Sequence, residues 1–274
     1  MGSPYRPSSD GKVTPVSRRL VVTADDVGLD PGMTEGAIRA HRDGIVTACS
    51  IVANGRAFDD AVARLRETPS LDVGVHLALV EERALTTGLP MPRGYVQFLL
   101  SRRRVDIERE LRAQIERVLA TGLRVTHLNG HQHLHAVPSI FRLVVRLAGE
   151  YGISYVRAPR DAGGSGGVAR RLAVRALAML TPAGGTNDRT IGIVEADHLT
   201  AERLITLLDA VEGVTELVTH PGVQVRGYAH WRYAWDRETE ALCDPRLKTA
   251  IAARGITLVR PSTLSSPPAP LPAR

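Results

Sequence analysis

Short apolar runs recur along the chain and alternate with segments whose apolar residues follow a helical period. Apolar runs of this length, bounded by polar or turn-forming residues, predict buried strands. They fall at residues 19–24, 46–53, 72–79, 125–128, 153–158, 190–194, 215–219 and 256–260. Helices are predicted after Asp30 as N-cap with Pro31 behind it, and over 57–67, 105–120, 138–152, 199–211 and 244–255. A strand-then-helix rhythm favours a parallel sheet with right-handed crossovers.

No long linker interrupts this rhythm, which favours one domain. We expect an α/β fold, an irregular (β/α) TIM-like barrel over residues 18–260, in preference to an open doubly wound sheet. The ends are rich in proline and serine, so residues 1–17 and the Pro-rich residues 261–274 are predicted to be flexible tails. Within 160–189, glycines flank a short segment rich in alanine, leucine and arginine, which predicts an inserted excursion or lid.

Composition narrows the functional classes. With 274 residues, 43% of them hydrophobic, the chain can bury a large core. No apolar stretch approaches the ~18 residues of a membrane span, and the N-terminus lacks the layout of a secretory signal, so we expect a cytoplasmic protein. Cys49 and Cys243 lie far apart and are expected to be packing residues.

The net charge of +6 includes the run Arg102-Arg103-Arg104 and raises the question of contact with nucleic acid or an anionic membrane. Aromatic residues make up only 4% of the chain, and no basic stripe alternates with them as a stacking platform requires. We therefore favour a solvated surface of scattered arginines and expect no nucleic-acid partner. The sequence leaves a homodimer open.

Unusual polar residues fall at the carboxyl ends of the predicted strands, where an α/β barrel assembles its active site. Asp25 and Asp26 follow strand 19–24, and His76 interrupts an apolar run. His220 follows strand 215–219. On a regular strand the two aspartate side chains would point apart, so a bend or bulge is needed to bring both to one cavity. The ordinary alternatives are a core histidine at position 76 and a turn or cap for the aspartates.

The densest cluster is HLNGHQHLH, which places four of the nine histidines within residues 127–135. All four are at odd positions, His127, His131, His133 and His135, so they share one side if the segment is extended. One ion cannot accept four neighbouring imidazoles from one strand. One aspartate with two histidines is a recurrent ligand set for divalent Zn, Fe, Mn or Mg. A surface histidine tract with incidental metal affinity is the alternative.

These residues resemble a known family. The segments TADDVGLDPGMTEGAIRAHRDGIVTACSIVANG, PSLDVGVHLAL, THLNGHQHLHAVPSIF, YGISYVRAP and HPG occur in the order found in the YdjC-like carbohydrate deacetylases, which include the ChbG chitooligosaccharide deacetylases and the hopanoid-associated HpnK branch. The resemblance covers about residues 18–260. It implies an irregular (β/α) barrel, one divalent metal ion, and hydrolysis of an N-acetyl group from an amino sugar or glycoconjugate. Mg²⁺ and Zn²⁺ are the first candidates, with Mn, Fe, Co and Ni as alternatives.

Residue by residue, the resemblance implies that Asp26, His76 and His131 are the metal ligands and that Asp25 is the general base. Many members have Phe in place of Val27 and Asp in place of Asn129. Asn129 can still donate and accept hydrogen bonds, so an active enzyme remains the expectation.

Amide hydrolysis also needs a general acid to protonate the departing amine, for which we expect His220, with His133 as second choice. Arg157 is expected to bind a sugar hydroxyl or an acidic substituent. The aromatic loop that holds Tyr228, Trp231, Tyr233 and Trp235 suits stacking on a sugar face, or else ordinary rim packing. Two other functions stay open: a different metal-dependent hydrolase such as a phosphoesterase, and a non-catalytic protein that binds metal or nucleic acid.

Overall fold

The computed structural model describes residues 5–7, 13–15, 17–101, 106–160, 172, 178–179, 181, 184–231 and 233–264. Its main sheet is parallel throughout. The strands are β3 (Arg18–Val27), β4 (Ala48–Ile51), β5 (Asp72–Leu77), β6 (Val125–Gly130), β7 (Tyr155–Val156), β8 (Arg189–Ile191), β9 (Gly213–Thr219) and β10 (Thr257–Leu258). Each lies within or overlaps one of the eight predicted strands.

The strand order is β7-β6-β5-β4-β3-β9-β8, with β10 added beside the first residues of β3. In the described chain no strand ladder joins the two ends of this order, β7 and β8. The Asn187 side chain bridges the gap instead: its Oδ1 accepts from the Ala158 N–H at 2.7 Å, and its Nδ2 donates to the Ala158 carbonyl at 2.7 Å. The predicted irregular single-domain (β/α) barrel is confirmed, and this junction is where it departs from regularity.

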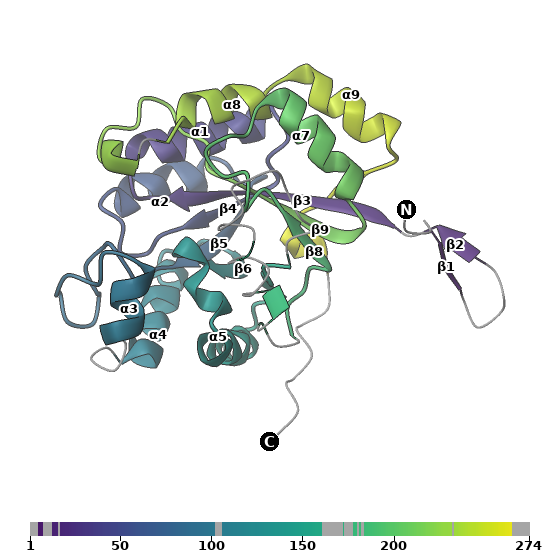
Figure 1. The fold of residues 1–274 in the computed structure, drawn as a ribbon. Helices are drawn as coiled ribbons and strands as arrows, with labels where there is room; N and C mark the ends of the chain where they lie inside the picture. Colours follow the sequence, from purple (N-terminus) through teal and green to yellow (C-terminus); the bar gives the residue numbers. More distant parts are fainter. Residues whose placement is uncertain are drawn as a thin grey trace.

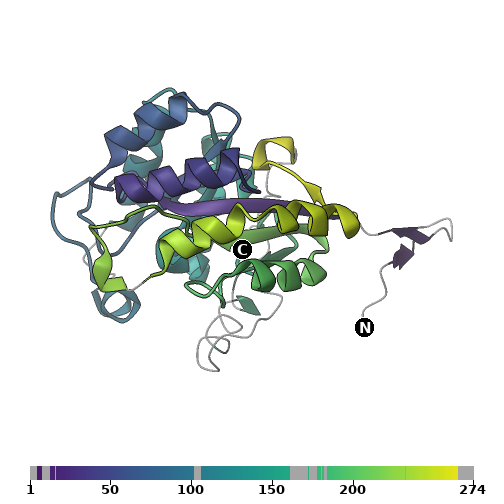
Figure 2. The same ribbon diagram turned by 90° about the horizontal axis from the view of Figure 1, so that it is seen from above.

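Six helices lie where the sequence predicts them. They are α1 (Pro31–Arg42), α2 (Phe58–Arg66), α4 (Ile107–Leu119), α5 (Pro138–Glu150), α7 (Ala201–Leu207) and α9 (Pro245–Ala253). Asp30 caps α1 as predicted, because its Oδ1 accepts from the Gly32 N–H at 2.8 Å. Figure 1 shows α1, α7, α8 and α9 on one side of the strands and α3, α4 and α5 on the other; Figure 2 gives the view from above.

Two helices were not predicted, α3 (Tyr95–Ser101) and α8 (Trp235–Leu242). The buried side of α8 includes Glu238 and Thr239, and polar residues on the inner face conceal the amphipathic pattern. The short α3 carries apolar residues on two faces, which likewise hides its period.

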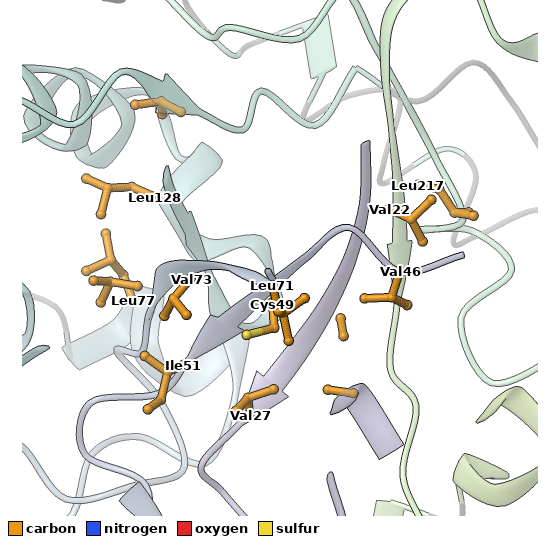
Figure 3. Close-up of a cluster of buried hydrophobic side chains, with 14 of the residues drawn as sticks. Val22, Val27, Val46, Cys49, Ile51, Leu71, Val73, Leu77, Leu128 and Leu217 are labelled. Atoms are coloured by element: carbon orange, nitrogen blue, oxygen red, sulfur yellow. The ribbon is translucent and has the colours of Figure 1, made fainter. Parts of the chain in front are cut away.

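Buried side chains from consecutive strands meet in the core, as Figure 3 shows for one part of it. Val22 on β3, Cys49 on β4, Leu128 on β6 and Leu217 on β9 are each at most 1% exposed. Cys49 therefore packs in the core as predicted. Both cysteines are free thiols.

The ends of the barrel differ from the predicted boundaries. In the N-terminal segment, β1 (Tyr5–Pro7) and β2 (Val13–Pro15) pair antiparallel. After residue 260, the 3₁₀ turn Pro261–Thr263 packs on the barrel, because the Ser262 N–H donates to Asp72 Oδ2 at 2.7 Å. Residues 265–274 and most of the predicted 160–189 excursion lie outside the described residues. Within the described ranges, every helix falls short of the length and apolar character that a bilayer crossing requires.

Candidate metal centre and active site

The end of β3 is bulged, and the bulge turns two neighbouring aspartates into one cavity. The pairing of β3 with β9 is regular as far as Ala24, but its pairing with β4 shifts register between Ala24 and Val27. Asp26 has a φ of 66°, a left-handed conformation that costs a non-glycine residue about 1–3 kcal/mol. Asp25 and Asp26 consequently both line a cavity of about 420 Å³. The predicted bulge is confirmed.

Asp26, His76 and His131 come together at this bulge from three strands or strand ends. Asp26 Oδ1 lies 2.8 Å from His131 Nδ1 and 3.2 Å from His76 Nε2. One ligand atom from each residue lies within 4.8 Å of the other two, and all three residues are buried. Burial alone would raise the pKa of Asp26, but the two imidazoles outweigh it and hold that pKa well below its usual range.

Asn129 fixes which nitrogen of His76 carries a proton. Its Nδ2 donates to Ser50 Oγ at 2.7 Å and to Asp25 Oδ1 at 3.2 Å, so its Oδ1 accepts from His76 Nδ1 at 2.7 Å. The other ring nitrogen, Nε2, then presents a lone pair to the carboxylate of Asp26. Two acceptors at 3.2 Å repel unless a cation lies between them, so this donor set fits a divalent metal ion.

Glu81 contacts the far side of the His131 ring and was missed by the sequence analysis. Its Oε2 lies 2.8 Å from His131 Nε2, and its backbone has a φ of 69°. A carboxylate in this position orients a ligating imidazole and makes it more basic. Burial alone would lower the pKa of His131, but Asp26 and Glu81 raise it to about 10. The available signal was an acidic residue soon after an apolar strand, in the segment VEER.

Asp25 lies beside this cluster and is held by Arg157. Arg157 Nη1 donates to Asp25 Oδ2 at 2.6 Å, and Nη2 donates to Oδ1 at 2.9 Å. Burial alone would raise the pKa of Asp25, but Arg157 outweighs it and holds that pKa well below its usual range. The same guanidinium donates through Nε to Glu216 Oε1 at 2.9 Å.

Arg157 is 0% exposed and is not among the residues that line the cavity, and its role as a sugar contact stays a prediction. Its three guanidinium nitrogens are all engaged by Asp25 and Glu216, so none is left to reach into the cavity. The sequence analysis missed Glu216, because its position inside a strand gave no sign that it neutralises an arginine from another strand.

His220 lines the same cavity as the two aspartates. Its Nδ1 lies 2.9 Å from the Tyr233 hydroxyl, and its backbone N–H donates to Glu238 Oε1 at 2.5 Å. Burial keeps the pKa of Tyr233 well above its usual value, so the hydroxyl stays protonated and can donate to Nδ1. The imidazole then carries its own proton on Nε2, the nitrogen without a protein partner in the described chain.

Comparison with known proteins identifies the chain. The sequence profile described as YdjC-like protein matches residues 19–253. The chain belongs to the YdjC-like family. A carbohydrate deacetylase of Brevibacillus brevis (strain 47) is 34% identical over 258 residues, which cover 90% of this chain and 99% of that protein. A chitooligosaccharide deacetylase of Enterobacter sp. (strain 638) is 30% identical over 261 residues, covering 89% and 98% respectively.

Among solved structures, a protein of Enterococcus faecalis V583 with a proposed role in cellobiose-phosphate cleavage has the same fold. Its TM-score is 0.70 at 24% identity, and the alignment covers 91% of this chain and all of that one. The likeness extends over the whole barrel of this YdjC-like chain.

The remaining histidines of the HLNGHQHLH segment separate in this YdjC-like protein. The strand ends at Gly130 and the chain enters a 3₁₀ turn, His131–Ala136, in which Gln132 and His133 have positive φ angles. The odd-numbered histidines therefore do not share one side, as an extended segment would require. His127 contacts Ser50 inside the barrel, at 3.0 Å.

His133 lines the cavity, and its Nδ1 is buried without a hydrogen-bond partner in the described chain. His135 lies behind the cavity, where its Nε2 is 3.1 Å from the Arg157 carbonyl. Burial lowers the pKa of His133 well below its usual value and that of His135 to about 3, so both are neutral at physiological pH.

The aromatic loop divides between cavity and core. Trp231 lines the cavity and stacks on His131, with ring centroids 5.6 Å apart. Tyr228 is 3% exposed and its hydroxyl donates to Glu82 at 2.6 Å, so it supports Trp231 from behind. Tyr228 is not among the residues that line the cavity, and its contact with the substrate stays a prediction. Tyr233 lines the cavity, whereas Trp235 packs at the start of α8.

Proposed function

We propose that this chain is a metal-dependent carbohydrate deacetylase that removes the N-acetyl group from an amino sugar or glycoconjugate. The observation that carries the proposal is the buried cluster of Asp26, His76 and His131, which opens into the same cavity as the separate carboxylate of Asp25. The relatives named above, deacetylases of carbohydrates, match nearly the full length of the chain. A cavity of about 420 Å³ falls within the size range of small-ligand sites.

The ligand set favours Zn²⁺ or a similar transition metal over Mg²⁺. Two of the three groups are imidazoles, and Mg²⁺ prefers oxygen ligands. A bound divalent ion would supply two effects: it lowers the pKa of water towards neutrality and polarises the acetyl carbonyl.

Asp25 is placed to accept the proton of the attacking water. Its lowered pKa keeps it ionised at neutral pH, the form that accepts a proton. Oδ2 accepts a hydrogen bond from Arg157 alone, whereas Oδ1 accepts from Arg157 and Asn129. One lone pair of Oδ2 is thus free. Arg157 and Asn129 hold the carboxylate in place while it acts.

His220 is placed to protonate the departing amine. In the protonated ring, Nδ1 donates to the Tyr233 hydroxyl oxygen, and the proton on Nε2 remains for the departing amine. Burial lowers the pKa of His220, although Asp26 and Asp25 oppose that shift. A lowered pKa makes the imidazolium a more ready proton donor. Trp231 offers an aromatic face beside the ligands for the sugar ring.

Acetate release from a panel of N-acetylglucosamine conjugates tests this proposal. The protein is first treated with a chelator, and Zn²⁺, Mg²⁺, Mn²⁺, Fe²⁺, Co²⁺ and Ni²⁺ are then restored one at a time. We expect loss of acetate release on chelation and its return with a transition metal. Phosphate release from phosphate esters without acetate release would favour a phosphoesterase. Tight metal uptake with no turnover on the whole panel would favour a binding protein.

A further inference from the structure

Helix α3 is apolar on two faces, and only one of them is covered. Phe98 is buried in the main core, and Tyr95 packs against the same core. Val96, Leu99 and Leu100 point outwards and are 73%, 43% and 85% exposed. Residues at this spacing of three and four lie on one side of a helix. The outer side of α3 is therefore a continuous stripe of aliphatic side chains in water.

The loop before α3 extends this stripe. It leaves the catalytic cavity at Glu81 and returns at Pro92, whose carbonyl accepts from the Glu81 N–H at 2.7 Å. Leu89 lies in this loop and is 63% exposed. The described chain exposes six large aliphatic side chains, and four of them lie within residues 89–100. Such clustering on one element marks an interaction surface rather than scattered surface residues.

Two exposed arginines lie near the same stripe, Arg83 in the loop before α3 and Arg93 two residues before the helix begins. The described residues 83–101 contain no aspartate or glutamate. Arg83 and Arg93 are exposed, and neither forms an ion pair within the described part of the chain. A groove of about 510 Å³ opens beside α3, with Arg93, Asp106 and Arg109 among its lining residues. We call the exposed stripe, together with Arg83 and Arg93, the α3 surface.

We propose that the α3 surface docks onto an anionic lipid bilayer. Aliphatic side chains enter the boundary between headgroups and acyl chains, while neighbouring arginines pair with lipid phosphates. A second copy of this chain fits less well. A two-fold interface would bring Arg83 and Arg93 close to the same arginines of the other copy, and these like charges repel. An anionic bilayer offers an apolar layer to the aliphatic stripe and negatively charged headgroups to the arginines.

Docking there would bring the catalytic cavity to the bilayer. A Cβ added at Gly94, one residue before α3, would lie 3.9 Å from Gln132 Oε1, and Gln132 lines the cavity. Docking itself does not depend on the deacetylase activity, so the two proposals can fail separately.

Co-sedimentation of the full chain with vesicles tests docking. Vesicles of phosphatidylcholine mixed with phosphatidylglycerol are compared with phosphatidylcholine alone, at low and high salt. We expect binding to the anionic vesicles only, weakened by salt. The double variant Arg83→Gln/Arg93→Gln should bind about 25-fold more weakly, since each arginine near an anionic surface contributes about fivefold. The triple variant Val96→Ser/Leu99→Ser/Leu100→Ser should lose binding.

Matched controls separate this surface from others. Arg237→Gln removes an exposed arginine on α8, and Leu172→Ser/Met179→Ser removes the two large apolar side chains that the described chain exposes outside residues 89–100. Both variants should bind as the parent does. Unchanged thermal unfolding midpoints show that the variants fold. Equal binding to both kinds of vesicle, or none to either, would overturn the proposal. So would unimpaired binding by the triple variant, or a dimer in solution that the triple variant dissociates.

Discussion

Two buried polar clusters meet at the bulge of β3, and they are built differently. The arginine cluster consists of Asp25, Arg157 and Glu216, with hydroxyl donors from Thr23 and Tyr155. Every carboxylate oxygen in it accepts a hydrogen bond from a protein donor. It is therefore satisfied without any ligand.

The histidine cluster consists of Asp26, His76, His131 and Glu81. It contains two carboxylates, and one ring nitrogen that presents a lone pair to a carboxylate oxygen. That contact between two acceptors is relieved only when a cation or an added proton lies between them. This difference supports the proposed roles, in which the arginine cluster holds the base in place and the histidine cluster binds a metal ion.

The largest effect on metal binding and acetate release is expected for substitutions in the histidine cluster. Asp26→Asn and His131→Ala should each abolish metal binding and acetate release together, because each removes a ligand. Calorimetric titration with Zn²⁺ and the acetate assay measure the two effects. His198→Ala, which removes an exposed histidine, is the control and should change neither. If His131→Ala bound Zn²⁺ with the affinity of the parent, the proposed ligand set would be incorrect.

Substitution of Asp25, the carboxylate next to Asp26, should lower turnover and leave metal binding unchanged. Asp25→Asn should keep Zn²⁺ affinity close to that of the parent and lose about 10²- to 10⁴-fold in kcat, the usual contribution of a general base. Separate measurement of metal binding and kcat on one preparation makes the test. Retained turnover would remove Asp25 from the base role and would leave the arginine cluster purely structural.

The sequence predicted the strands that carry the two clusters better than the side-chain contacts within the clusters. The eight strands were recognisable because each is a short apolar run, and the aspartates and His76 stand out at strand ends. The contacts that divide the two clusters depend on residues from separate strands. Arg157 follows an apolar run like a rim residue, yet carboxylates from β3 and β9 enclose it completely.

Other contacts could not be predicted because they depend on the local conformation of the backbone. The alternation rule for HLNGHQHLH holds only in an extended chain, and Gln132 and His133 leave that conformation. Glu81 reaches His131 through its own positive φ, which nothing in its immediate sequence requires. The Asn187 side chain links the segment before β8 to Ala158, just after β7. Such positions become visible only when distant segments are placed together.

Removing the cation of the arginine cluster should cost stability. Arg157→Leu leaves Asp25 and Glu216 buried without their partner, and loss of one member of a buried pair typically costs about 3–5 kcal/mol. Urea unfolding measures this change. Arg112→Leu is the control, because its ion pairs with Glu108 and Glu150 are at the surface and should contribute about 0–1 kcal/mol. If Arg157→Leu kept full stability and raised only KM, Arg157 would be a substrate contact after all.

The smallest expected effect concerns the carboxylate behind His131. Glu81→Gln keeps an oxygen that can accept from His131 Nε2 but removes the negative charge, so Zn²⁺ affinity should fall about 10- to 100-fold while binding persists. Glu82→Gln is a matched neighbour, since its amide oxygen can still accept from the Tyr228 hydroxyl and it does not contact His131. Calorimetric titration should find parental affinity in Glu82→Gln. Equal affinities in both variants would mean that Glu81 adds nothing to the metal site, and the histidine cluster would reduce to Asp26, His76 and His131.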